Sequence, residues 1–165
     1  MLRASRNRVV SVLLLCIVAL PAAAFQAAAP GKVTGTFVVG GADAGLKHVR
    51  ATREKLDEQG NVGYSVLLSA RPAEGDMTDW RTGDPAEKGS FIYAMFEPNG
   101  AIWIVELGHA KAKSGRFGVL MEVKAEDFKV AGDRISGRIR TLREQEFTQD
   151  KFELDLTFEA PIEKR

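Results

Sequence analysis

The chain has 165 residues, 45% of them hydrophobic and 27% charged, which is typical of one soluble globular domain and excludes a disordered tail, a fibrous repeat or a multi-span membrane protein. Its 23 basic and 22 acidic side chains give a formal net charge of +1, so no strong positive field indicates nucleic-acid binding. The single Cys excludes an internal disulfide framework.

The first segment of the chain has the order of features that defines a secretory signal peptide. Three arginines precede the apolar run 9–20, and the small residues 21–24 then supply a cleavage site. A membrane anchor is the alternative, but residues 9–25 contain Pro21 and fall at or below the roughly 20 residues that a spanning helix needs. We therefore predict cleavage after Ala24, a periplasmic or secreted location, and no stable membrane anchor in the mature form.

The predicted domain organisation has three parts: residues 1–24 are a secretory signal peptide, 25–31 a flexible leader, and 32–163 a single β domain. Cleavage removes three arginines and the only Cys, and it leaves a slightly acidic chain. Thiol catalysis, thiolate metal sites and disulfides are therefore excluded for the mature form, whose stability rests on its core.

Short apolar segments separated by Gly or Pro run through the rest of the sequence and predict β-strands. In chain order, the predicted strands are residues 32–39, 46–53, 64–70, 90–97, 101–107, 117–123, 134–141 and 151–159. The strongest hairpin signal lies between two of these segments, at Pro98, Asn99 and Gly100.

About eight short strands joined mostly by hairpin-length loops predict an all-β, antiparallel fold. A closed or nearly closed barrel is our first expectation and a two-sheet sandwich is the alternative, because strand patterns do not specify closure. Parallel α/β folds are disfavoured, since the crossover helices that they need are missing. One short helix is expected in the 71–89 loop.

The two strands nearest the C-terminus alternate most regularly. Apolar and charged residues occupy opposite faces of 151–159, and the basic residues of 134–141 share one face. If these strands pair antiparallel, a basic row faces an acidic row, and each pair stabilises the sheet by a few tenths of a kcal/mol to about 1 kcal/mol. The large side chains expected to fill most of the interior are Phe37, Phe152, Leu154, Leu156 and Phe158.

The middle strands lack this alternation, because residues within 64–69, 91–96 and 101–107 are apolar on both faces. A strand with two apolar faces is covered on both sides. The external candidate for this cover is a protein partner or a second copy of the chain, and membrane contact is a further alternative. An uncovered edge of this composition is an aggregation hazard.

The internal candidate for the cover is the 71–89 loop. Residues 76–82 within it indicate one or two helical turns that carry Met77 and Trp80. Asp76 is the expected N-cap, and Asp79 three residues later completes an imperfect capping box.

Five residues are candidates for binding. His48 and His109 are the only histidines and have no neighbouring His or Cys, so they are a poor ligand set for zinc or copper. Both would bind an anionic or polar ligand if they lay at one mouth of the barrel, and ordinary surface positions are the alternative. Trp80, Arg81 and Trp103 are the best recognition candidates, because aromatic residues and Arg dominate binding hot spots, and core filling is the competing interpretation.

The sequence predicts no metal, no cofactor and no catalytic residue. The acids in 74–84 lack the spacing of an EF-hand loop. A G-x-S-x-G elbow and a phosphate-binding Gly-rich motif are both missing. Glu106 is the one acid whose burial would point to carboxylate chemistry, and a solvated position is the alternative.

Several stretches resemble secreted bacterial domains of unassigned function, namely residues 35–39, 46–48, 66–69, 135–139 and 158–162. The resemblance follows most of the predicted mature chain in order. It implies a small exported β domain and transfers no catalytic residue.

The leading functional hypothesis is an exported, non-catalytic binding domain for a protein partner or for a small apolar or amphipathic ligand. The partner is favoured slightly because large side chains are expected to fill the interior. The second hypothesis is a small hydrolase or isomerase, which requires Glu106, His48 or His109 to converge within hydrogen-bond reach. The third is a structural or assembly component of the cell envelope, which would be oligomeric.

Overall fold

The computed structural model of the chain describes residues 29–119 and 121–164. The predicted signal peptide, residues 1–24, and residues 25–28 of the predicted leader lie outside the described residues. In the part of the chain that the structure describes, no helix has the length and apolar character needed to cross a membrane.

The described chain is mostly β-strand and contains two short helices. The strands are β1 (Lys32–Val39), β2 (Ala42–Asp43), β3 (His48–Lys55), β4 (Val62–Ser69), β5 (Phe91–Phe96), β6 (Ile102–Gly108), β7 (Arg116–Gly118), β8 (Val123–Ala131), β9 (Arg134–Thr141), β10 (Gln145–Phe147) and β11 (Asp150–Glu163). The helices are α1 (Thr78–Arg81) and α2 (Pro85–Lys88).

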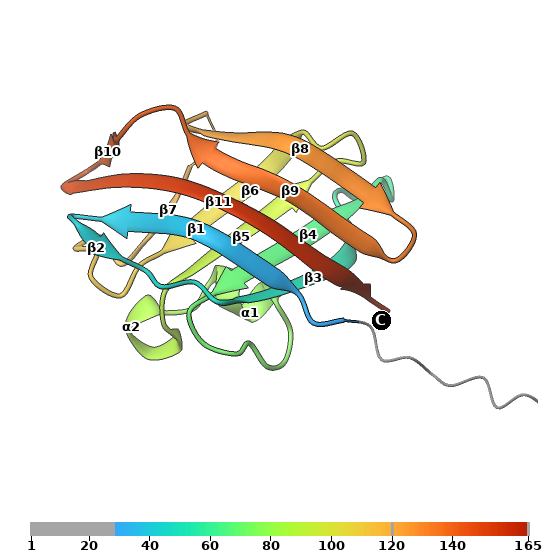
Figure 1. Ribbon diagram of the computed structural model, residues 1–165, viewed down its shortest axis with the longest axis horizontal. Coiled ribbons are helices and arrows are strands. Elements are labelled where there is room, and N and C mark those ends of the chain that lie inside the picture. Colours follow the sequence, from blue (N-terminus) through green and yellow to red (C-terminus); the bar gives the residue numbers. More distant parts are fainter. Residues whose placement is uncertain (1–28, 120, 165) are drawn as a thin grey trace, which may run out of the picture.

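One curled sheet contains these strands, in the order β2-β1-β11-β3-β4-β5-β6-β7, with β9 and then β8 on the opposite side of β11 from β1. The long strand β11 joins the two halves of the sheet. It pairs antiparallel with β1 and β9, and its last residues, Ile162 and Glu163, pair parallel with β3. The half that contains β2, β1, β11, β9 and β8 therefore faces the half that contains β3 to β7 (Figure 1).

The expected closed barrel is wrong, because the sheet is a curled half-barrel. Closure would require β7 to pair with β8, and the described residues contain no such pairing. β7 has only 3 residues, and the β8–β9 register shifts between Glu126 and Lys129, so neither strand offers a long regular edge. The parallel pairing of β11 with β3 also corrects the expectation of a purely antiparallel sheet.

The main core fills the space between the two halves of the sheet. The large side chains expected there are all buried in one cluster: Phe37, Phe152, Leu154, Leu156 and Phe158. Strands from both halves contribute to this cluster, including Ile92 of β5 and Ile139 of β9. The alternating apolar positions of β1, β9 and β11 therefore point inward as their sequence pattern predicts.

Most of the predicted strands are present, but the interpretation of 117–123 as one strand is wrong. β7 ends at Gly118, β8 begins at Val123, and Met121 between them is 82% exposed. The continuation of β8 to Ala131 was not predicted. A shift in its pairing near Asp127, which has a φ of +52°, interrupts the two-residue period by which strands are recognised.

The 71–89 loop covers the outer face of β4 and β5, as the internal candidate required. Trp80 of α1 packs edge-on against Phe91, with ring centroids 5.9 Å apart. The cluster that the loop forms with these strands consists of Leu67, Met77, Trp80, Phe91, Tyr93 and Met95. The doubly apolar character of β4 and β5 is therefore explained within the chain itself.

The helical turns of this loop differ in detail from the prediction. The Asp76 carboxylate accepts a hydrogen bond from the Thr78 backbone N–H at 2.9 Å, but the N-cap position of α1 is Met77. The second helix, α2, was not predicted. Its N-cap, Asp84, accepts a hydrogen bond from the Ala86 N–H at 2.8 Å, and Pro85 occupies the first helical position.

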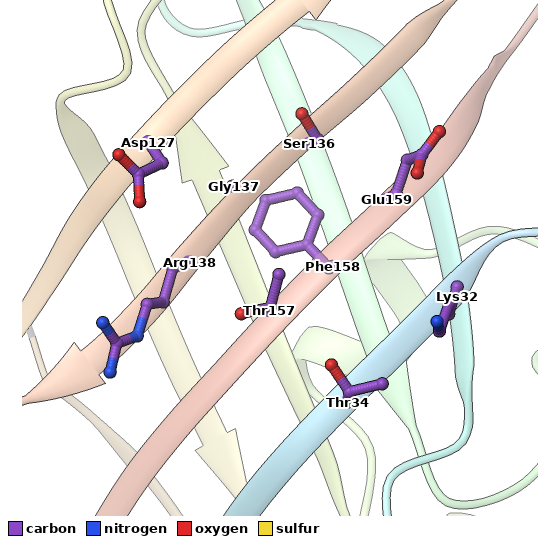
Figure 2. Close-up of a pocket in the computed structure, with 9 residues that line it drawn as sticks. All are labelled: Lys32, Thr34, Asp127, Ser136, Gly137, Arg138, Thr157, Phe158 and Glu159. Atoms are coloured by element: carbon purple, nitrogen blue, oxygen red, sulfur yellow. The ribbon is translucent and has the colours of Figure 1, made fainter.

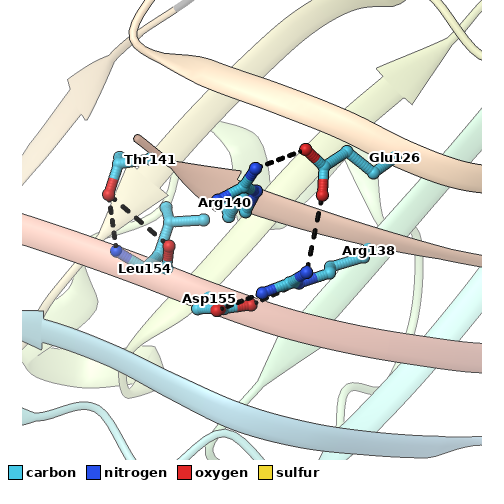
Figure 3. Close-up of polar contacts among 6 residues, drawn as sticks. All are labelled: Glu126, Arg138, Arg140, Thr141, Leu154 and Asp155. Atoms are coloured by element: carbon cyan, nitrogen blue, oxygen red, sulfur yellow. Dashed lines mark hydrogen bonds and ion pairs between the residues drawn. The ribbon is translucent and has the colours of Figure 1, made fainter. Parts of the chain in front are cut away.

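The expected ladder of ion pairs joins β9 to β11 on the outer face of the sheet. Arg138 donates to both carboxylate oxygens of Asp155, at 2.7 and 2.5 Å (Figure 3). Arg134 donates to Glu159 at 2.7 Å. Glu126 of β8 extends the ladder, because it accepts a hydrogen bond from Arg140 at 2.7 Å.

Candidate functional site

The five predicted binding residues do not form one site. Trp80 is only 6% exposed, because it belongs to the cover over β5. Arg81 follows it and lies 3.8 Å from the Glu106 carboxylate. His48 begins β3, and His109 follows the last residue of β6. Of these five residues, only Trp103, which is 42% exposed, presents a large aromatic surface to solvent.

The two histidines lie at the same end of the sheet but not side by side. His48 pairs with Ser69, Ser69 with Phe91, and Phe91 with Gly108, the residue before His109. Three steps of about 4.8 Å between neighbouring strands place them roughly 14 Å apart. At this separation the two histidines cannot contact the same small group directly, and the Glu106 carboxylate lies beside Arg81.

His109 is buried at the start of the turn between β6 and β7. It is 1% exposed, its Nδ1 accepts a hydrogen bond from the Lys111 N–H at 3.0 Å, and its ring meets that of Phe37 edge-on. Burial lowers the pKa of His109, and the Ala42 backbone and the nearby carboxylates offset this only in part. The neutral imidazole therefore stabilises the turn between β6 and β7.

Asp150 anchors the same turn from β11. Its carboxylate accepts hydrogen bonds from the Lys113 N–H at 3.0 Å and from the Ser114 N–H at 2.8 Å. Burial raises the pKa of Asp150, but these backbone donors, a hydrogen bond from the Ser114 side chain and the Lys113 charge together leave the pKa below its usual value. Asp150 is thus an ionised structural carboxylate whose oxygens are occupied by the chain itself.

A hollow of about 310 Å³ lies on the outer face of β1, β11, β9 and β8 (Figure 2). The residues that line it are Lys32, Thr34, Asp127, Ser136, Gly137, Arg138, Thr157, Phe158 and Glu159. Its most prominent cation, Arg138, already pairs with Asp155 and Glu126 (Figure 3). The lining therefore combines basic and acidic side chains, and its Arg138 and Glu159 are already ion-paired within the chain.

A second hollow, of about 370 Å³, lies between the β3–β4 turn and the β5–β6 turn and is called the Trp103 groove below. These turns adjoin because β4 pairs with β5. The residues that line the groove are Leu56, Asp57, Asn61, Val62, Glu97, Pro98 and Trp103. Its walls are therefore apolar and acidic.

A break in the β5–β6 pairing accounts for the exposure of Trp103. Met95 pairs with Ile104 and Phe96 pairs with Ile102, so Trp103 is the extra residue of a β-bulge. Bulges re-aim side chains at the edge of a sheet. Val62, which is 47% exposed, lines the groove with it.

The two carboxylates of the Trp103 groove are held by amides and not by cations. Asp57 accepts hydrogen bonds from the Asn61 N–H at 3.0 Å and from the Asn61 side-chain amide at 2.6 Å, and Glu97 accepts one from the Asn99 amide at 3.3 Å. The Asn61 side chain is the main cause of a lowered pKa at Asp57. Within residues 29–119 and 121–164, neither carboxylate forms an ion pair.

Exposed apolar side chains also occur at the other end of the molecule. Met121, Leu142 and Phe147 are 82%, 65% and 37% exposed, and they lie near the β9–β10 connection. Phe147 stacks on Phe117, with ring centroids 5.1 Å apart. This end of the molecule therefore has exposed apolar side chains. Neither of the two hollows described above is lined by them.

No residues in the described part of the chain gather as three or more His, Cys, Asp or Glu side chains able to hold a metal ion. Comparison with known proteins gives no further guide to function. The chain matches no protein-family model, and it has no significant match among curated proteins or solved structures.

Sequence reasoning identified Trp103 but not its groove. Asp57 lies between the predicted strands 46–53 and 64–70, and Glu97 lies beside the predicted hairpin turn at 98–100. These positions predict a shared groove only once β4 and β5 are known to be neighbours, because this pairing brings the two turns together.

Proposed function

We propose that the chain is an exported, non-catalytic binding domain that engages a partner protein through the Trp103 groove. The observation that carries the proposal is a large aromatic side chain, 42% exposed, in a groove with apolar walls. Trp is one of the residue types enriched at the energetic centres of protein interfaces. Its indole N–H also gives it a hydrogen-bond donor for a partner.

A protein is favoured over a small apolar ligand for two reasons. Large aromatic and aliphatic side chains occupy the main core, so the interior is a poor place for a ligand. The Trp103 groove, at about 370 Å³, is near the low end of the 300–1,000 Å³ range of ligand pockets and lies between two surface turns. It suits one or two side chains of a larger partner.

The proposal places the partner at the end of the sheet and not over the faces of the middle strands. The outer face of β4 and β5 already packs against Met77 and Trp80. Of the segments 64–69, 91–96 and 101–107, the last contributes the exposed Trp103.

Site-specific photo-crosslinking tests the proposal. A photoreactive phenylalanine analogue replaces Val62 in the groove, and in a matched control it replaces Leu142 at the opposite end. In cells that produce the protein naturally, we expect a protein adduct of one defined mass from position 62 and not from position 142. The same adduct should disappear when Trp103→Ala is added to the chain.

The masses of the adducts distinguish the alternatives. An adduct of twice the mass of the chain identifies a second copy as the partner, and a small adduct identifies a low-molecular-weight ligand. An adduct that persists in Trp103→Ala, or that forms equally from positions 62 and 142, contradicts the proposal.

A further inference from the structure

We infer that the Trp103 groove binds a positively charged side chain of the partner, with arginine preferred over lysine. The inference rests on the proposed function and adds the chemistry of the bound group. It follows from the apolar walls, the uncompensated carboxylates and the indole ring, which occur together at this place in the fold.

The apolar walls fit the stem of a long cationic side chain. Leu56, Val62 and Pro98 line the groove beside the indole. Arg and Lys bury their methylene stems against apolar surface while the charged head stays near water or a counter-charge. A purely apolar ligand would satisfy these walls but would leave Asp57 and Glu97 to be desolvated without compensation.

The carboxylates supply the counter-charge. Asp57 and Glu97 line the groove from two different turns, and no basic side chain lines it with them. Asn61 fixes the Asp57 carboxylate through two hydrogen bonds. The site is therefore preorganised and negative before a ligand arrives, which reduces the ordering that binding requires.

The two Trp residues of the chain differ in a way that supports the inference. Trp80 already has a cation from its own chain, because the Lys88 ammonium lies 5.6 Å from its ring centroid. Trp103 has no cation over its ring among the residues that the structure describes. Trp is the best ring for cation–π contact, and the planar guanidinium can also stack on it, which favours arginine.

Two other hollows of the molecule do not share this combination. On the face of β1, β11 and β9, Arg138 is paired with two carboxylates. A hollow of about 460 Å³ beside the β6–β7 turn is lined by both Asp84 and Arg116, so its charges have opposite signs. The Trp103 groove alone among these three has acidic side chains and no basic side chain in its lining.

A titration with two model peptides tests the inference. The probes are acetyl-Ala-Arg-Ala-amide and its citrulline twin, which has nearly the same shape and no charge. The reporter is the indole N–H signal of Trp103 in a ¹H–¹⁵N NMR spectrum, assigned with the Trp80→Phe variant because the chain has only 2 Trp. We expect the arginine peptide to bind at least tenfold more tightly than the citrulline peptide. The affinity of the arginine peptide should fall as salt is added.

Charge variants sharpen the result. Glu97→Gln and Asp57→Asn should each lower the affinity for the arginine peptide about three- to tenfold. Neither substitution should change the affinity for the citrulline peptide. Glu153→Gln, which removes an exposed carboxylate on β11 outside the groove, is the matched control and should change neither. Retention of the spectrum outside the groove shows that the variants remain folded.

Two outcomes overturn the inference. Equal binding of the two peptides at the Trp103 signal would show that the groove takes a planar side chain without regard to charge, and the proposed function would stand. An unresponsive Trp103 signal with both peptides would show that the groove does not select a cation. The proposed function is decided separately, by the Trp103-dependent crosslink from position 62.

Discussion

The buried His109 imidazole makes the free energy of unfolding depend on pH below neutrality. Burial lowers the pKa of His109 in the folded chain from its ordinary value of 6.5. The unfolded chain therefore binds more protons near that pH, so stability is fully present above pH 6.5 and is lost as the pH falls through 6.5 toward the folded-state pKa. Carboxylates with lowered pKa values, such as Asp150, change the free energy of unfolding only at lower pH than His109 does.

Urea unfolding at pH 7.5, 6.5 and 5.5 checks this prediction. We expect His109→Asn, whose side-chain oxygen can replace Nδ1 as acceptor for the Lys111 N–H, to flatten the fall in stability between pH 7.5 and 5.5. The unsubstituted protein is the control. The prediction is wrong if His109→Asn has the same slope as the unsubstituted protein.

Thr148 carries local backbone strain in the turn between β10 and β11. Phe147 pairs with Asp150, which leaves a two-residue turn, and Thr148 has a φ of +58°. A β-branched residue is unfavourable in this left-handed region, and the cost is of the order of 1 kcal/mol. Glycine adopts the same conformation readily.

Thr148→Gly is therefore expected to raise the free energy of unfolding by about 0.5 kcal/mol, because the relief of strain exceeds the freedom that glycine adds to the unfolded chain. The neighbouring Gln149→Gly is the control, because position 149 does not have a positive φ and glycine only adds freedom to the unfolded chain there. Thermal unfolding of the two variants should shift in opposite directions. A loss of stability in Thr148→Gly would show that the threonine side chain makes a contribution larger than the strain.

At the scale of the elements, α1 stabilises the outer face of β5 while the bulge on β6 presents a side chain to solvent. Trp80 and Trp103 are therefore the same residue type in two different roles. Trp80 is 6% exposed and Trp103 is 42% exposed. Truncation of a buried Trp usually costs about 3–5 kcal/mol, whereas substitutions away from packed sites change stability by about 0.5 kcal/mol or less.

The expected result is that Trp80→Ala lowers the free energy of unfolding by about 3 kcal/mol and that Trp103→Ala lowers it by less than about 1 kcal/mol. Chemical denaturation of both variants measures the difference. A similar loss in both would make Trp103 a structural residue, and this would remove the main support for the Trp103 groove as a binding site.

Some elements could be predicted from the sequence because local pattern alone defines them. β1 and β9 have the bounds expected from 32–39 and 134–141, since both combine alternation with a Gly-containing boundary. β8 was missed because its pairing shifts where Asp127 takes a positive φ. α2 was missed because one turn of helix leaves no period to detect.

Sheet closure and the candidate site could not be predicted because they depend on contacts between distant segments. Whether β7 pairs with β8 is decided by the curl of the whole sheet and not by either strand's own pattern. The Trp103 groove requires that the turns after β3 and β5 meet, and Trp103 becomes exposed only because the β5–β6 register shifts beside it.

At the scale of the whole molecule, the proposed export makes a prediction about the N-terminus. The intact mass of the protein from a native producer should correspond to a chain that begins at Phe25, because cleavage is expected after Ala24. Replacing Ala22 and Ala24 with bulky charged residues should block processing, since signal peptidase accepts small residues there. Detection of the full-length chain as the main species outside the cytoplasm would contradict this expectation.

Native mass spectrometry of the mature protein from its natural compartment tests the binding account most directly, because it reports bound molecules and copy number together. We predict a complex of the chain with a partner protein, lost in Trp103→Ala and retained in the control Leu142→Ala. A bare monomer in all three samples, or a complex that survives Trp103→Ala, would contradict the claim that the Trp103 groove is the binding site.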